Sequence, residues 1–195
     1  YVGILQSALG VIDTEKNGYG ELFNEINMHT GGIATSLELY NDVTKVKEKE
    51  FKATFEIKTK ALYDKLPFAF DMMGEILTES CLDDTKRMKE ILAMLKSRLL
   101  MKFQSSGHTT AALRALSYAS PSAKLKDMTN GVDFFRKVDW LDTHFEEEKE
   151  HLSEKLKELS VKLFRADRMM LSYTAAGEGL KGFEKMVQSL KDRLY

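Results

Sequence analysis

The apolar residues at the start of the chain recur at the spacing of an α-helix. Positions three or four apart lie on one helical face, and this spacing predicts a short helix over residues 2–12 and a second helix from Tyr19 onward. Asn17-Gly18 is a turn signal between the two helices. Gly31-Gly32 ends the second helix, because glycine readily adopts the left-handed conformation at a helix C-terminus.

The pattern then changes to an alternation of apolar and polar residues, which predicts two strands over residues 33–40 and 51–61. Such alternation is typical of an antiparallel sheet with one buried and one solvated face. The polar segment 41–50 would join the strands. The expected buried face carries Ile33, Thr35, Leu37, Leu39, Phe51, Ala53, Phe55, Ile57, Thr59 and Ala61, and the second strand's polar face carries Lys52, Thr54, Glu56, Lys58 and Lys60.

Helical spacing predominates in the rest of the chain. Helices are expected from Leu66-Pro67, from Asp83-Asp84, over 109–118, over 141–164 and over 179–194; residues 132–140 form a short segment, and 168–175 are expected to form a third strand. The order predicts an α+β fold, with helices on one face of an antiparallel sheet and a helical extension. We expect one domain over 1–195, with a helical insertion at 105–140. Since three strands make a small sheet, other strands are expected upstream of Tyr1, which begins in mid-pattern like an excised fragment.

The composition narrows the possible partners. With 43% hydrophobic and 30% charged residues, the chain is an ordinary globular sequence. The net charge of -1 argues against a nucleic-acid partner, and no apolar run approaches the roughly 20 residues of a membrane span. Cys81 is the only cysteine, so no internal disulfide can form and a reducing compartment is favoured.

Two motifs suggest chemistry but lack the context that the chemistry requires. Residues 177–182 match G-x-G-x-x-G, yet only 13 residues follow, too few for the second strand and acid of a dinucleotide site. His144 and His151 share a helical face, but seven residues separate them by about 10.5 Å, too far to share one zinc ion. Cys81 and His108 have no nucleophile–base pattern around them. We therefore predict no catalytic, metal or cofactor site in this chain.

Several ordered segments carry a resemblance that no single motif provides. They are Tyr19-Gly20-Glu21-Leu22, residues 25–33 with the paired glycine, residues 105–111, Gly131-Val132-Asp133-Phe134-Phe135 and Met169-Met170-Leu171-Ser172. In this order they resemble the presequence protease and falcilysin branch of the pitrilysin (insulin-degrading, inverted zinc motif) metallopeptidases. The resemblance spans nearly the whole chain.

This resemblance implies the third, non-catalytic domain of a two-halved zinc peptidase that encloses a chamber. The family's zinc helix carries H-x-x-E-H, and its counterpart here is residues 1–10, which contain neither histidine nor acid. Zinc is then expected only in the parent protein, whose other domains and peptide substrates are the expected partners. The polar strand residues Thr54, Glu56 and Lys58 would face the chamber. The expected location of the protein is the bacterial cytoplasm or an organelle matrix.

Two other classes of function stay open. A non-enzymatic scaffold or peptide-binding module of the same superfamily would share these features, and an upstream H-x-x-E-H would distinguish the peptidase. A nucleotide-dependent enzyme depends only on the glycine run. Missing strands would leave an open sheet edge, so self-association of the fragment is also expected.

Overall fold

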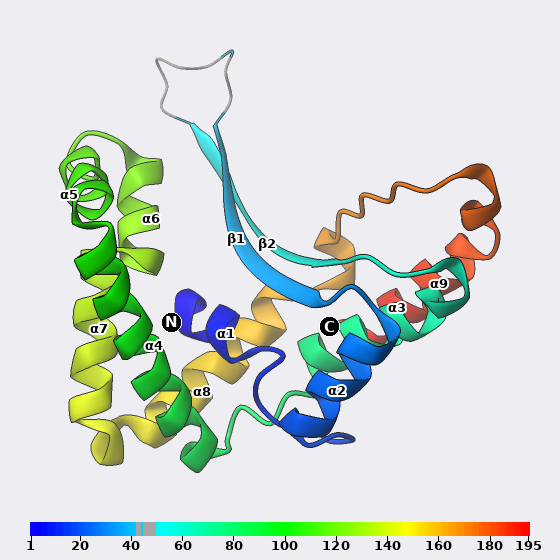
Figure 1. Cartoon of the computed structure of the whole chain (residues 1–195), viewed down its shortest axis with the longest axis horizontal. Coiled ribbons are helices and arrows are strands. Elements are labelled where there is room, and N and C mark those ends of the chain that lie inside the picture. Colours follow the sequence, from blue (N-terminus) through cyan, green and yellow to red (C-terminus); the bar gives the residue numbers. More distant parts are fainter. Residues whose placement is uncertain (42–43, 45–49) are drawn as a thin grey trace.

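A computed structural model shows a long β-hairpin that rises from a body of helices (Figure 1), and it describes residues 1–41, 44 and 50–195. The connection predicted at 41–50 therefore lies mostly outside the described residues. The fold is α+β, as the sequence predicts. The elements are α1 (Val2–Ala8), α2 (Tyr19–His29), β1 (Ile33–Asn41), β2 (Phe51–Thr59), α3 (Leu66–Thr78), α4 (Thr85–Ser105), α5 (Gly107–Leu116), α6 (Pro121–Asn130), α7 (Val132–Thr143), α8 (Phe145–Leu163) and α9 (Phe183–Arg193), with short 3-10 turns at Tyr63–Lys65, Ala166–Arg168 and Gly177–Leu180.

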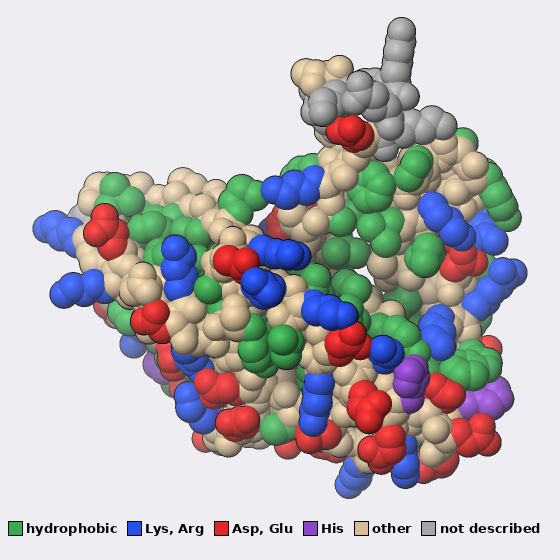
Figure 2. All heavy atoms as spheres, turned by 180° about the vertical axis from the view of Figure 1, so that it is seen from behind, with side chains coloured by type: hydrophobic (Ala, Val, Ile, Leu, Met, Phe, Trp, Pro, Cys, Tyr) green, Lys and Arg blue, Asp and Glu red, His purple; other side chains and the backbone are tan. Residues whose placement is uncertain are grey.

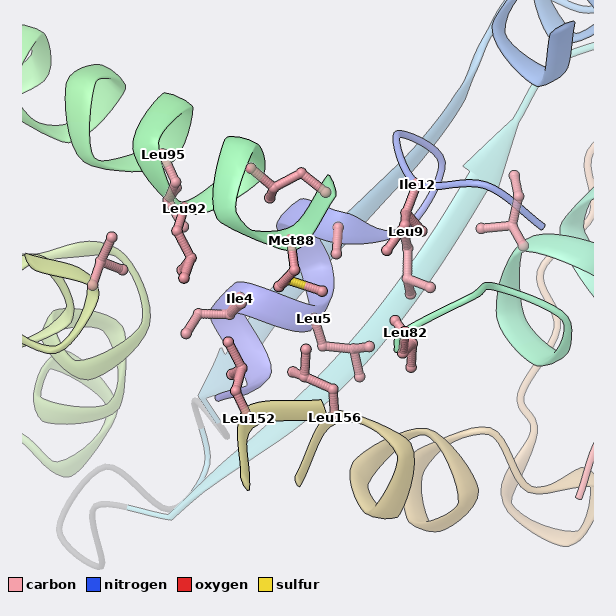
Figure 3. Close-up of a cluster of buried hydrophobic side chains, with 14 of the residues drawn as sticks. Ile4, Leu5, Leu9, Ile12, Leu82, Met88, Leu92, Leu95, Leu152 and Leu156 are labelled. Atoms are coloured by element: carbon pink, nitrogen blue, oxygen red, sulfur yellow. The ribbon is translucent and has the colours of Figure 1, made fainter. Parts of the chain in front are cut away.

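Helix α1 lies at the centre of the main core, between α4 and α8 (Figure 3). Its side chains Ile4, Leu5 and Ala8 are 0% exposed. The buried side chains that surround it are Met88 and Leu92 of α4 and Leu152 and Leu156 of α8. The helix ends earlier than predicted, because Gly10 turns the chain with a φ of 80°, which only glycine adopts without strain.

The hairpin has the two faces that the alternation predicts. In its antiparallel register Leu37 lies opposite Phe55, and Thr35 opposite Ile57. The Phe55 ring packs edge-on against Phe164 at the end of α8, with 5.1 Å between centroids. Ile57 packs on both hydrophobic clusters. Helices thus cover the apolar face, although Ala53 near the hairpin tip is exposed rather than buried, because the hairpin extends beyond the helices there.

Two polar contacts fasten the hairpin to α1. Gln6 Nε2 donates to the Thr35 carbonyl at 3.3 Å, and Thr35 Oγ1 donates to the Gln6 carbonyl at 3.0 Å. The central helix therefore fixes the position of β1 as well as that of α4 and α8.

Residues 105–140 are helical, as expected, and their three helices share one ion-pair cluster. Arg114 of α5 contacts the fully buried Asp127 of α6 at 2.6 Å and Asp133 of α7 at 2.8 Å. The other oxygen of Asp127 accepts from the Val132 backbone N–H at 2.9 Å, which starts α7. The segment expected only as a short stretch at 132–140 is thus a full helix. Whether these residues are an insertion stays a prediction.

The third strand predicted at 168–175 is wrong. Residues 169–176 form no helix or strand, and the sheet of the described residues contains only β1 and β2. The alternation arises because one side of this extended segment packs on the second cluster, formed by Phe70, Met73 and Leu190. Burial of one face does not require a paired neighbour.

Arg193 of α9 holds the C-terminal helix against α3. Its guanidinium donates to the Asp71 carbonyl at 2.8 Å and also contacts the carboxylates of Asp71 and Glu79. Lys16 adds an ion pair to Glu79 at 3.1 Å. Although burial alone raises the pKa of Glu79, the hydrogen bonds from Arg193 and Lys16 lower this pKa below its ordinary value.

Gly3→Ala is expected to destabilise the fold by about 1–3 kcal/mol, measured as a lower urea midpoint. An added Cβ would lie 2.7 Å from the Thr129 carbonyl oxygen and 2.8 Å from the Phe134 ring, and backbone cannot give way easily. Gly20→Ala in α2 is the matched control, since its Cβ would meet nothing within 4 Å. An unchanged or raised midpoint for Gly3→Ala would contradict the close packing of α1.

The pKa of Glu79 is lower in the folded protein than in the unfolded chain. The ionised Glu79 carboxylate therefore stabilises the fold fully above its unfolded-state pKa, and this stabilisation is lost as the pH falls through the folded-state pKa. We expect the free energy of unfolding to decrease below about pH 4.3. Glu79→Gln should be less stable at pH 7 and show a smaller decrease in acid. If the free energy of unfolding changed with pH in the same way in the native protein and in Glu79→Gln, Glu79 would not contribute to the pH dependence of stability.

Candidate functional site

The side chains Thr54, Glu56 and Lys58, expected to face a chamber, lie on the same face of β2. Two residues of β1, Glu38 and Tyr40, join them there. The strand register puts Glu38 opposite Thr54 and Tyr40 opposite Lys52, and the long Tyr40 side chain reaches past Thr54 to Glu56. We name these five residues the polar hairpin face. It is opposite the face that Phe55 and Ile57 pack against the helices.

Glu56 is the centre of the polar hairpin face. Its Oε1 accepts from Tyr40 Oη at 2.6 Å and from Thr54 Oγ1 at 3.0 Å, and its Oε2 lies 2.8 Å from Lys58 Nζ. Lys58 also lies 3.6 Å from Glu38 Oε1. One carboxylate thus orders a hydroxyl, a phenol and an ammonium group on one face of the hairpin.

The charges of this face stabilise one another. Hydrogen bonds from Lys58 and then Tyr40 lower the pKa of Glu56. The hydrogen bond to Glu56 raises the pKa of Lys58, and it likewise raises the pKa of the Tyr40 phenol. At neutral pH the face therefore presents one cation, two carboxylates and a protonated phenol.

The face is accessible to a polar ligand. The side chains of Lys58 and Glu38 are 57% and 43% exposed. Donors and acceptors of both signs in an extended row can exchange their mutual contacts for those of a peptide at little cost, because exposed ion pairs stabilise a fold by only about 0–1 kcal/mol. The arrangement suits binding of mixed polar side chains.

Candidate zinc ligands are scattered over the described part of the structure. In the described part of the chain, no three acidic, histidine or cysteine side chains lie together as metal ligands would. Helix α1, which the resemblance predicts to be the counterpart of the zinc helix, fills its inward positions with Ile4, Leu5 and Ala8. No step of zinc chemistry can be derived from these residues.

The histidines noted in the sequence are engaged in separate contacts. His144 stacks on Trp140 with 5.0 Å between ring centroids, and its Nδ1 lies 2.9 Å from the Trp140 carbonyl oxygen. His151 instead meets the ring of Tyr1, 6.2 Å away. His108 is an exposed residue in the first turn of α5.

The remaining motifs also lack a reactive setting. The glycine run at 177–182 forms a 3-10 turn and then begins α9 at Gly182, whose φ is 75°. No paired strand precedes it, so the strand–turn–helix context of a dinucleotide site is missing from the described residues. Burial, followed by the nearby charge of Asp83, raises the pKa of the Cys81 thiol, which lowers its reactivity at neutral pH.

Glu38 and Tyr40 belong to the polar hairpin face but were not predicted from the sequence. Both alternate with the apolar Leu37 and Leu39, so a period of two in β1 was the available signal. What the sequence lacked was the register that puts Glu38 opposite Thr54 and Tyr40 opposite Lys52.

Comparison with known protein families identifies the class of protein to which this chain belongs. It belongs to the peptidase M16-C associated family, whose family model matches residues 1–141. Among curated proteins it is similar to Protein HypA of Clostridium perfringens, with 31% identity over 97% of this chain and 19% of that protein. It is also similar to the mitochondrial presequence protease of Drosophila melanogaster, with 27% identity over 94% of this chain and 18% of that protein.

A third relative is presequence protease 1 of Arabidopsis thaliana, chloroplastic and mitochondrial, which is 22% identical over 88% of this chain and 16% of that protein. The chain thus spans less than a fifth of the length of these relatives. Within the described residues, no helix has the length and apolar character needed to cross a membrane.

Tyr40 is expected to titrate above the ordinary tyrosine pKa of about 10, because ionised phenolate would lose its hydrogen bond to Glu56 and face its charge. Glu56→Gln should move this pKa back down. NMR of ¹³Cζ-labelled tyrosine measures it, and Tyr40→Phe identifies the signal among the seven tyrosines. A Tyr40 pKa that Glu56→Gln leaves unchanged would contradict the network.

Proposed function

We propose that this chain is a non-catalytic, chamber-forming domain of a zinc metallopeptidase that degrades short unstructured peptides. The observation that carries the proposal is the two-sided hairpin. Its apolar face, with Phe55 and Ile57, rests on helices, whereas its polar face keeps an ordered row of charged groups accessible. A wall of a peptide chamber requires one face of each kind.

The relatives support the class of parent protein. Two of them are named presequence protease, and each is more than five times as long as the part that this chain covers. Catalysis would then belong to other domains of the parent, which would hold the zinc ion. Helix α1 supports this division, because an inward face of Ile4, Leu5 and Ala8 offers no atom that could bind zinc.

The polar hairpin face supports a part in holding peptides. Cleavage of an extended peptide needs contacts along its length as well as at the bond that is cut, since contacts away from the reacting atoms position the substrate. Glu56 would attract basic side chains and Lys58 acidic ones, so the face would accept mixed sequences. A closed chamber would admit only short chains and would exclude folded proteins.

The same proposal implies partners and a location. The other domains of the parent would contact this chain directly, and unstructured peptides would contact the polar hairpin face. The mitochondrial and chloroplastic relatives favour an organelle matrix, or the cytoplasm in a bacterial host. A reducing compartment would keep Cys81 as a thiol.

Charge reversal on the polar hairpin face tests the proposal in the parent protein. Glu56→Lys should raise KM for a lysine-rich unstructured peptide by about threefold to tenfold with kcat nearly unchanged, because it replaces a weak attraction by repulsion. Glu158→Lys is the matched control, since this exposed carboxylate lies on α8 and pairs with Lys155 and Lys162. The 195-residue chain alone should cleave nothing.

Two outcomes would contradict the proposal. If Glu56→Lys and Glu158→Lys had equal effects on KM, the polar hairpin face would have no part in binding. If the parent lacked zinc-dependent cleavage altogether, the non-enzymatic scaffold would be the correct function. Zinc-dependent cleavage by the isolated chain would overturn both functions.

A further inference from the structure

The turn Asn17-Gly18 is also a sequence at which an asparagine side chain can lose its amide. Asparagine is among the thermally labile residues of proteins. The loss is fastest where glycine follows, because glycine has no side chain to hinder attack of its backbone nitrogen on the asparagine side chain. The chain contains a second such pair, Asn130-Gly131. The structure gives the two pairs opposite surroundings.

The backbone nitrogen of Gly18 is free to react. Gly18 is exposed and lies just before α2, and a Cβ at this position would meet only Asp13 Oδ1, 4.0 Å away. Among the described residues, the Gly18 N–H donates to no other group. The N–H of the buried Gly131 is instead engaged, because it donates to the Asp127 carbonyl at 2.9 Å. Attack is therefore easier at Asn17.

The side chain of Asn17 is directed at a buried carboxylate. Its Nδ2 donates to Glu75 Oε1 at 2.7 Å, and the same oxygen accepts from Thr14 Oγ1 at 2.5 Å. Glu75 is only 1% exposed. Because a carboxylate can only accept hydrogen bonds, this oxygen needs a donor on each side. An aspartate at position 17 would present an acceptor where a donor is required.

Asn130 has a partner of the opposite charge. Lys102 Nζ donates to the Asn130 side-chain oxygen at 3.0 Å and to the Asn130 carbonyl at 2.9 Å. A carboxylate at position 130 would therefore be stabilised by an ammonium group. Carboxylates on the surface of this protein lie among cations, as Figure 2 shows over the lower half of the molecule. Loss of the amide should be tolerated at Asn130 and disruptive at Asn17.

The loop that contains Asn17 is tied to the end of α3 by its main chain. The Glu15 N–H donates to the Glu79 carbonyl at 2.9 Å, and the Cys81 N–H donates to the Asp13 carbonyl at 2.8 Å. Two carboxylates that touch in a buried site cannot both stay ionised, and a buried charge without a partner is strongly destabilising. A second carboxylate would therefore push the loop away from α3 and open these bonds.

We propose that Asn17 is a site of spontaneous deamidation whose product releases this loop. The Gly18 nitrogen gives up its proton and forms a bond to Cγ of Asn17. The bond from Cγ to Nδ2 breaks, and Nδ2 takes up a proton and leaves as ammonia, so that a succinimide ring remains. Water, the only co-reactant, then opens the ring at either carbonyl and gives aspartate or isoaspartate. No atom is oxidised or reduced.

The modification would loosen the connection between α1 and α2 as the protein ages. Its consequence comes from the structure rather than from the dipeptide, because the same reaction at Asn130 would place a carboxylate beside Lys102. The inference is independent of the proposed function, since the reaction requires neither zinc nor a peptide.

Peptide mapping by mass spectrometry, during incubation of the parent protein at mildly alkaline pH, tests the site. Position 17 should accumulate aspartate and isoaspartate several times faster than position 130. Gly18→Ala should suppress the product at position 17, because the added Cβ hinders attack. The φ of -65° at Gly18 suits any residue, so this variant should fold normally.

Hydrogen–deuterium exchange in the parent protein measures release of the loop. In Asn17→Asp, the Glu15 and Cys81 amides should exchange about tenfold or more faster than in the native protein, because the bonds that protect them open. Asn130→Asp is the matched control and should leave both amides protected. Adding Glu75→Gln to Asn17→Asp should restore slow exchange, since the new amide can donate to the new carboxylate.

Each other result would overturn the proposal. Equal accumulation of product at positions 17 and 130 would show that the free nitrogen of Gly18 does not direct the reaction. Slow exchange in Asn17→Asp would show that the loop tolerates a carboxylate. If Asn17→Asp failed to fold, recovery of folded protein by the added Glu75→Gln would support the proposal, and no recovery would contradict it. None of these measurements uses peptidase activity, so their failure is distinct from failure of the proposed function.

Discussion

Complete burial of helix α1 is the constraint on which the rest of the structure depends. A short helix that is apolar around most of its circumference is stable only when other elements enclose it. Here α4 and α8 enclose it from two sides, and Gly3 lets the Thr129 carbonyl and the Phe134 ring approach from a third. The hairpin completes the enclosure through the paired contacts of Gln6 and Thr35.

The same burial determines the course of the chain after α1. The turn at Gly10 leads into a loop that is fixed by the buried carboxylate of Glu75, which accepts from Thr14 Oγ1 at 2.5 Å and from Asn17 Nδ2 at 2.7 Å. Backbone bonds from Glu15 to Glu79 and from Cys81 to Asp13 then tie this loop to the end of α3. An apolar helix in the centre thus requires a polar, well-bonded exit, and it leaves no room for metal ligands on the helix itself.

Sequence patterns predicted the parts of this fold that bury one continuous face. Helical spacing predicted the helix that begins near Asp83-Asp84, which is α4, because a helix repeats its own periodicity whatever its neighbours are. Alternation likewise predicted both faces of the hairpin, because successive side chains of a strand point to opposite faces. Pairing is different, since it depends on a second segment, and the third strand predicted at 168–175 was wrong although its alternation was real.

The segment at 132–140 was not recognised as helix because aromatic and β-branched residues such as Phe134 and Val138 are moderate helix formers, and tertiary packing decided their conformation. Of the polar hairpin face, Thr54, Glu56 and Lys58 could be predicted from alternation within one strand, whereas Glu38 and Tyr40 required the register between strands, which alternation alone does not fix.

The two faces of the hairpin contribute unequally to the stability of the fold. A two-stranded ribbon is marginal in water, so its persistence here depends on Phe55, Ile57 and Ile33 packing on the helices. The polar hairpin face contributes little by comparison, because its ion pairs are exposed and solvent screens them. Substitutions on this face should therefore leave the fold intact. The apolar face lacks this freedom, since the helices that pack against it fix Ile33, Phe55 and Ile57 in place.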